Sequence, residues 1–190
     1  MTNQETQQEQ VKPRITTVRL AKMAMLVAIS IVLVALIHFP IFPAVAFLEY
    51  DPADIPILIG TFAFGPVAGV LLTIVTAVIQ GLTVSAASGV YGILMHIIAT
   101  SALVVTAGLI YKHNKTRKGA VIALLSGVVA MTVVMIGANM IITPIFMGVP
   151  ASVVWSLMPF IAGFNAIKAG VNGLVTFLVY KRISGFLHKQ

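Results

Sequence analysis

The sequence predicts an all-α membrane protein, built as a six-transmembrane-helix bundle with its N- and C-termini on the cytoplasmic side. Of its 190 residues, 59% are hydrophobic and only 9% are charged, whereas a soluble domain carries about 25% charged residues. The mean hydropathy of +1.04 agrees with this class. A third observation concerns the basic residues, which gather almost entirely in short clusters between long apolar stretches.

Eleven of the twelve Lys and Arg residues fall into three clusters. These are Lys12, Arg14, Arg19 and Lys22; Lys112, Lys115, Arg117 and Lys118; and Lys181, Arg182 and Lys189. Basic residues beside membrane spans mark the cytoplasmic side, so the net charge of +7 indicates orientation in the bilayer rather than nucleic-acid binding. The twelfth, Lys168, lies alone in the last apolar stretch. Because a cation in hydrocarbon is costly, we expect it to face a cavity or a ligand.

The first half of the chain is predicted to cross the membrane three times. The apolar run 17–37 is long enough for one span. A proline-rich loop, 38–53, follows, and Asp54 is expected to cap the next helix. The pair Gly65-Pro66 is a strong helix-breaking signal, which divides the following stretch into a short segment, 54–64, and a longer one, 66–83.

The second half supplies three further spans, predicted over 89–111, 119–143 and 159–180. Reading 54–83 as two spans rather than one gives four crossings between the first two basic clusters. An even number of crossings places both clusters on the same side of the membrane. The fifth span is expected to end at Thr143-Pro144, before an outer loop that holds Pro150 and Trp155. Residues 1–16 are polar and Gln-rich and are interpreted as a disordered cytoplasmic tail. The membrane domain then covers 17–184, and 185–190 form a second cytoplasmic tail.

Several functional classes are disfavoured. The chain has no cysteine, its four histidines show no metal-site spacing, and no phosphate-binding ATPase loop is present, so neither a metal nor a cofactor is expected. The acidic residues Glu49, Asp51 and Asp54 all lie near the outer surface, without an acid–base pair at depth, which argues against an intramembrane enzyme. A channel-like protein is disfavoured because the polar interior residues gather at one end.

The strongest candidate site lies in the sixth span. Asn165, Lys168 and Asn172 are spaced i, i+3 and i+7 and therefore share one helix face. Together they offer hydrogen-bond donors, acceptors and a positive charge, which suit the carbonyls and ring nitrogens of a heterocycle. The alternative is a helix-packing face held by interhelical hydrogen bonds.

Further candidates lie on neighbouring segments, and each has a structural alternative. Asn139 in the fifth span is as compatible with helix–helix hydrogen bonding as with ligand contact. The fourth span opens with Tyr91, Met95 and His96, and the loop 46–51 combines aromatic and acidic side chains that form either a lid or a membrane-interface anchor. The remaining substrate-site candidates are Asn139, Tyr91, Met95, His96, Phe47 and Glu49. Gln80 is assigned no functional role.

The first span carries a row of small residues, Ala21, Ala24 and Ala28. Small residues four apart let another helix approach closely. Because this row lies near the cytoplasmic end, it is a candidate surface for a membrane-embedded partner. Ordinary packing within the bundle is the alternative.

Over roughly residues 17–184 the chain resembles the substrate-binding (S) components of energy-coupling factor (ECF) vitamin transporters. The resemblance rests on an ordered set of motifs: Ala24-x-x-x-Ala28, the segment 48–56 (LEYDPADIP), the break 64–69 (FGPVAG) and the segment 164–170 (FNAIKAG). The last three are most similar to the riboflavin-specific branch.

The resemblance implies a six-helix bundle in a bacterial plasma membrane, with a vitamin bound beneath the first outer loop. Asn165 and Lys168 would hold the ring system, with Asn139 and the 46–51 loop nearby. Ala24 and Ala28 would face a coupling subunit of the EcfT type, which two ATPase subunits drive. The fourth-span sequence 91–96 (YGILMH) departs from the riboflavin branch, so hydroxymethylpyrimidine and pyridoxine stay open as alternative ligands.

Overall fold

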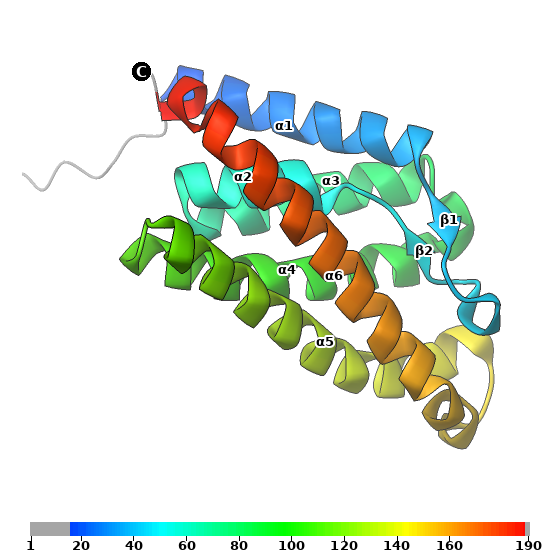
Figure 1. The fold of residues 1–190 in the computed structure, drawn as a ribbon. Helices are drawn as coiled ribbons and strands as arrows, with labels where there is room; N and C mark the ends of the chain where they lie inside the picture. Colours follow the sequence, from blue (N-terminus) through cyan, green and yellow to red (C-terminus); the bar gives the residue numbers. More distant parts are fainter. Residues whose placement is uncertain (1–15, 189–190) are drawn as a thin grey trace, which may run out of the picture.

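The computed structural model describes residues 16–188, which form a bundle of α-helices with a small β-hairpin at one end (Figure 1). The helices are α1 Thr17–Leu36, α2 Asp54–Phe64, α3 Pro66–Leu82, α4 Gly89–His113, α5 Arg117–Met147 and α6 Ala151–His188. The hairpin pairs β1 (Phe39–Pro40) with β2 (Glu49–Tyr50), and short 3-10 turns cover Pro43–Val45 (η1) and Ala86–Ser88 (η2). Residues 1–15 of the predicted N-terminal tail lie outside the described residues, as do 189–190. The predicted C-terminal tail begins inside α6, which stays helical to His188.

Four of the helices (α1, α4, α5 and α6) are long and apolar enough to cross a membrane. The other two, α2 and α3, are apolar but shorter. At 11 residues α2 is about 16 Å long, roughly half of a 30 Å hydrocarbon core. Most of its side chains are buried between neighbouring helices, so its backbone is shielded by protein along its length. The all-helical fold is therefore confirmed, and six crossings stay a prediction.

The break at Gly65-Pro66 is confirmed. Gly65 has a φ of +94°, a conformation that favours glycine, and Pro66 starts α3, where a helix does not need the missing N–H. The two helices then run side by side, because Gly69 packs against Thr61 and Gly60 packs against Leu72. A Cβ added at Gly69 would collide with the short Thr61 side chain, whereas one added at Gly60 would meet the flexible end of Leu72.

Two predicted helix ends are wrong, and both involve proline. Helix α5 continues through Pro144 to Met147 and ends at Gly148, whose left-handed φ of +65° lets its N–H bond to the Pro144 carbonyl. Helix α6 begins at Ala151, so Trp155 belongs to the helix and not to an outer loop. Proline is tolerated inside membrane helices because neighbouring groups satisfy the freed backbone carbonyl.

Within the described residues, the members of the three basic clusters gather at one end of the bundle, which we call the basic end. The start of α1, the α4–α5 connection and the end of α6 all lie on the left of Figure 1. Arg19 donates a hydrogen bond to the Phe64 carbonyl at 2.9 Å. Beside it, the rings of Phe62, Tyr111 and Tyr180 pack with centroids 4.2 to 5.8 Å apart. This end is therefore filled by aromatic side chains.

Candidate functional site

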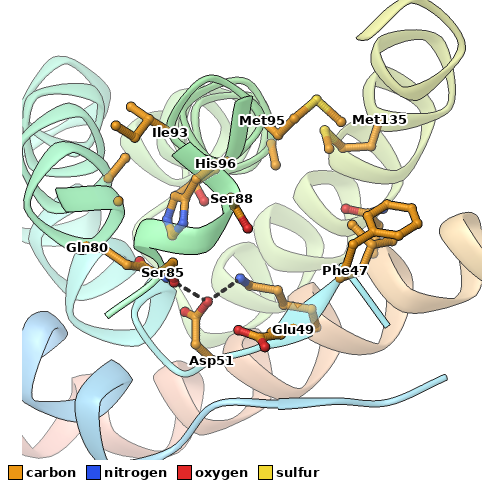
Figure 2. Close-up of a pocket in the computed structure, with 18 of the residues that line it drawn as sticks. Phe47, Glu49, Asp51, Gln80, Ser85, Ser88, Ile93, Met95, His96 and Met135 are labelled. Carbon is orange, nitrogen blue, oxygen red and sulfur yellow. Dashed lines mark hydrogen bonds and ion pairs between the residues drawn. The ribbon is translucent and has the colours of Figure 1, made fainter. Parts of the chain in front are cut away.

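The opposite end of the bundle holds a cavity of about 120 Å³, which we call the main cavity. Its walls come from α3, α4, α5 and α6, and the loop between α1 and α2 forms a further wall (Figure 2). One part of the lining is apolar. Met95 and Met135 lie on the side away from Asp51 in Figure 2. The apolar lining comprises Met95, Ala99, Met131, Met135 and Phe164, together with Ile93 and Ala77.

The loop that closes this end is fixed by hydrogen bonds from two helices. Ser30 of α1 donates to the Ala53 carbonyl at 3.0 Å. Asn172 of α6 donates to the Asp51 carbonyl at 3.0 Å and accepts from the Tyr50 hydroxyl at 2.9 Å. The β1–β2 pairing opposes Phe39 to Tyr50. Side chains next to these anchors are therefore held in defined positions.

The polar part of the cavity centres on a buried ion pair. Lys168 Nζ lies 2.8 Å from Asp51 Oδ2, and both residues are buried. Gln80 donates to the same oxygen at 3.3 Å, and the Ala53 N–H donates to Asp51 Oδ1 at 3.0 Å. Figure 2 draws the contacts of Lys168 and Gln80 as the dashed lines that meet at Asp51. Burial raises the pKa of Asp51, but the Lys168 ammonium outweighs it and the net pKa lies below the ordinary value.

A second buried carboxylate, Asp54, lies beside this pair. The sequence predicts Asp54 as a helix cap, and that prediction is wrong: it is the first residue of α2 and makes no capping bond. Its carboxylate instead accepts from Thr100 at 2.7 Å and from Asn172 at 3.1 Å. His96 Nε2 lies 3.8 Å from Asp54 Oδ1. Asp54 turns inward because these α4 and α6 groups offer the donors that its charge needs in a buried site.

Most of the predicted site residues meet at the main cavity. Six of them line it: Asn165, Lys168, Met95, His96, Phe47 and Glu49. Tyr91 lines a smaller neighbouring cavity of about 50 Å³, which shares Phe47 and Met95 with the first. Asn165 uses its amide group to donate to the Ile161 carbonyl at 2.8 Å, and its Oδ1 accepts no hydrogen bond from residues 16–188. That oxygen is available to a ligand.

Two predicted residues lie outside the lining of both cavities. Asn139 is fully buried, donates to the Met135 carbonyl and accepts from Thr143. The side chain of Asn172 forms hydrogen bonds with Tyr50, Asp51 and Asp54, so it positions the loop.

Sequence reasoning missed five polar residues that the structure brings to the cavity: Asp51, Gln80, Ser85, Ser88 and Thr100. Gln80 carried a signal, because a buried amide in an otherwise apolar helix needs a partner. Asp51 carried one too, since a solitary Lys168 in a span requires a counter-charge, and only three acidic residues were near enough to supply it. No group of three or more potential metal ligands occurs within residues 16–188.

A cavity at one end of an apolar helical bundle, with facing polar and apolar walls, is suited to hold a small molecule that has both polar and apolar groups. Residues 18–180 match the family described as "ECF transporter, substrate-specific component", and the chain belongs to this family. It is a transporter subunit that binds substrate, not an enzyme.

The matches also include individual relatives. The chain is 30% identical over 182 residues to the riboflavin transporter RibU of Staphylococcus aureus (strain TCH60), which covers 90% of this chain and 93% of that protein. It is 29% identical to the riboflavin transporter FmnP of Bacillus subtilis (strain 168), covering 90% and 95%. A solved structure titled "Structure and mechanism of the S component of a bacterial ECF transporter" matches with a TM-score of 0.77 and 31% identity, covering 90% of this chain and 98% of that one. The chain is therefore an S component like the riboflavin-transporting members of its family.

Proposed function

We propose that this chain is the subunit that binds riboflavin for its uptake across a bacterial plasma membrane. Both relatives named above are riboflavin transporters, and each aligns along nearly its whole length. The observation that carries the proposal is the two-sided lining of the main cavity. Asn165, Lys168 and Gln80 present polar groups on one side, and methionine side chains face them from the other.

This lining suits the two ends of a flavin ring. One end of the ring is an apolar dimethylbenzene, which methionine side chains accommodate because they are flexible and polarisable. The other end is a heterocyclic edge with carbonyl acceptors and an N–H donor. The Lys168 ammonium would donate to an acceptor on this edge, and the free Oδ1 of Asn165 would accept from its N–H.

The test is calorimetric titration of the purified protein with riboflavin, hydroxymethylpyrimidine and pyridoxine. We expect tight binding of riboflavin alone, and a yellow colour if the vitamin co-purifies. Binding of either smaller vitamin in preference would transfer the proposal to that ligand. Failure of all three to bind would overturn the vitamin assignment.

The membrane arrangement that we propose has six spans, with both termini in the cytoplasm. The described members of the three basic clusters lie at one end of the bundle, which supports this arrangement. The chain has no native cysteine, so Lys115→Cys and Val149→Cys each introduce a single label site. The two should react from opposite sides of the membrane. Reaction of both from the same side would contradict the arrangement.

We propose that the partners are a membrane-embedded coupling subunit of the EcfT type and two ATPase subunits, which supply the ATP hydrolysis. Ala21, Ala24 and Ala28 are exposed on α1 and leave room for a partner helix. The double change Ala24→Trp with Ala28→Trp should prevent co-purification of the partners and leave vitamin binding unchanged. Val129→Trp, at an exposed site on α5, is the matched control. Full co-purification of the double variant would exclude this surface.

A further inference from the structure

The fourth helix contributes a polar side chain with one ring nitrogen that forms no hydrogen bond with the part of the chain that the structure describes. His96 lines the main cavity, and its side chain is only 10% exposed. Its Nε2 atom is enclosed by protein yet forms no hydrogen bond with residues 16–188. The ring points toward Gln80, Ser85 and Asp51 in Figure 2. A buried polar atom without a partner is unfavourable by about 1–3 kcal/mol, so this arrangement calls for a partner that arrives with the ligand or with a proton.

The group nearest to Nε2 is a carboxylate. Asp54 Oδ1 is 3.8 Å away, just beyond hydrogen-bond distance, and Asp54 itself is fully buried. A small rotation of the imidazole lets Nε2–H donate to Asp54, which leaves Nδ1 for the cavity. A neutral imidazole would then present Nδ1 as an acceptor, whereas an imidazolium would present it as a donor.

The two buried carboxylates near His96 favour the second form, and the Lys168 ammonium opposes it. Among residues 16–188 the buried charged side chains are the carboxylates of Asp51 and Asp54 and the ammonium of Lys168, so one negative charge is left unbalanced. Water in the open cavity screens that charge, and a bound ligand displaces the water. An imidazolium at His96 would balance the cluster when the cavity is filled.

The other groups that face His96 are few. The loop contributes Glu49, Asp51 and His38 to the cavity lining, α2 contributes Asp54, and α6 contributes Lys168. The α3 and α5 walls contribute Gln80, methionine and small residues, none of which titrates near neutral pH. His96 is therefore the buried group whose protonation can follow ligand binding.

We propose that His96, positioned by Asp54, is a specificity-determining contact of this S component, and that its protonated form binds the ligand. The protonated ring donates from Nε2 to Asp54 and from Nδ1 to an acceptor of the heterocycle. This site selects a neutral ring that is rich in carbonyl and ring-nitrogen acceptors. The proposal rests on the proposed vitamin-binding function and adds that each binding event is linked to one proton.

The experiment is calorimetric titration of the full-length wild-type protein with riboflavin between about pH 5 and about pH 8, the range in which an unperturbed histidine changes its charge. Repeating it in buffers of different ionisation enthalpy gives the number of protons taken up. We expect uptake to approach one proton at the alkaline end. The Kd should then rise about tenfold per pH unit once the free protein has lost that proton.

Variants locate the proton. His96→Gln keeps a polar side chain that does not titrate, so it should abolish proton uptake and flatten the pH profile. His113→Gln, at an exposed site at the end of α4 that lines neither cavity, should leave both unchanged and is the matched control. Thermal unfolding of each variant confirms that it is folded.

The outcomes separate the two proposals. If the wild type binds riboflavin without proton uptake and with a flat pH profile, the His96 proposal is wrong and the vitamin assignment stands. If His96→Gln retains the uptake, the proton belongs to another group and the proposal is also wrong. If the wild type binds no riboflavin, the function proposed above fails first and the His96 proposal fails with it.

Discussion

The two ends of the helical bundle are built on opposite principles. At the basic end, the rings of Phe62, Tyr111 and Tyr180 fill the space between α2, α4 and α6. At the opposite end, a cavity is lined by a carboxylate–ammonium pair and by His96, whose Nε2 forms no hydrogen bond with the described residues. Close packing at the basic end stabilises the protein through dispersion contacts and buried apolar surface. The cavity lacks these contacts but leaves buried polar groups available to a ligand. The comparison teaches that this fold places its packing at one end and its recognition chemistry at the other.

The largest effect is expected from breaking the ion pair. Lys168→Met leaves the Asp51 carboxylate buried without its counter-charge, which destabilises a protein by about 3–5 kcal/mol. It also removes a charged donor from the ligand site, which weakens riboflavin binding by about 2–4 kcal/mol. Thermal unfolding in detergent and calorimetric titration measure the two effects separately.

A second variant separates charge balance from ligand contact. Combining Asp51→Asn with Lys168→Met removes both charges, so the stability of the double variant should recover and its ligand binding should not. Lys118→Met, at an exposed site in the basic end, is the control and should change neither. Normal riboflavin binding by Lys168→Met would show that the lysine serves only the structure.

At the basic end, we expect a substitution to lower the free energy of unfolding by a similar amount without changing ligand binding. Phe62→Ala empties a position in the aromatic cluster and should lower the free energy of unfolding by about 3–5 kcal/mol. The Kd for riboflavin should stay within about a factor of two of wild type, because Phe62 lines neither cavity. Leu125→Ala, at an exposed site on α5, is the matched control. A large rise in Kd for Phe62→Ala would show that the two ends are coupled.

The smallest effect is expected at the loop anchor. Asn172→Ala removes the hydrogen bonds to Tyr50, Asp51 and Asp54, at a cost of about 1–3 kcal/mol. Amide hydrogen exchange in residues 38–53 should accelerate as the loop loosens. Asn165→Ala is the contrasting variant: it should weaken ligand binding and leave exchange in the loop unchanged. Equal exchange in all three proteins would refute the anchoring role of Asn172.

Local signals predicted much of this fold. Apolar runs located the helices, and Gly65-Pro66 located the turn between α2 and α3, because a glycine with positive φ followed by a proline at a helix start is a local requirement. The same proline rule failed at Pro144 and Pro159. It was derived for helices in water, and a membrane helix continues through proline when protein surrounds the freed carbonyl.

The candidate site was predicted less completely. The solitary charge of Lys168 identified the correct face of α6, since burial of a cation is visible in sequence. Its partner, Asp51, lies in a loop with no helical or strand period, so its direction depends on tertiary contacts. Helical spacing also grouped Asn172 with Asn165. The two share a helix face but lie two turns apart. Asn172 donates a hydrogen bond to Asp54, whereas Asn165 lines the cavity.

The Asp51–Lys168 ion pair affects the rate at which a bound molecule can leave the cavity. Asp51 belongs to the loop that forms one wall of the cavity, and Lys168 belongs to a helix on the other side. Moving that loop outward therefore separates a buried carboxylate from its ammonium. Each 1.4 kcal/mol of added barrier slows such a step by about tenfold. The time that a bound molecule stays in the cavity therefore depends partly on the Asp51–Lys168 ion pair, which lies within the protein.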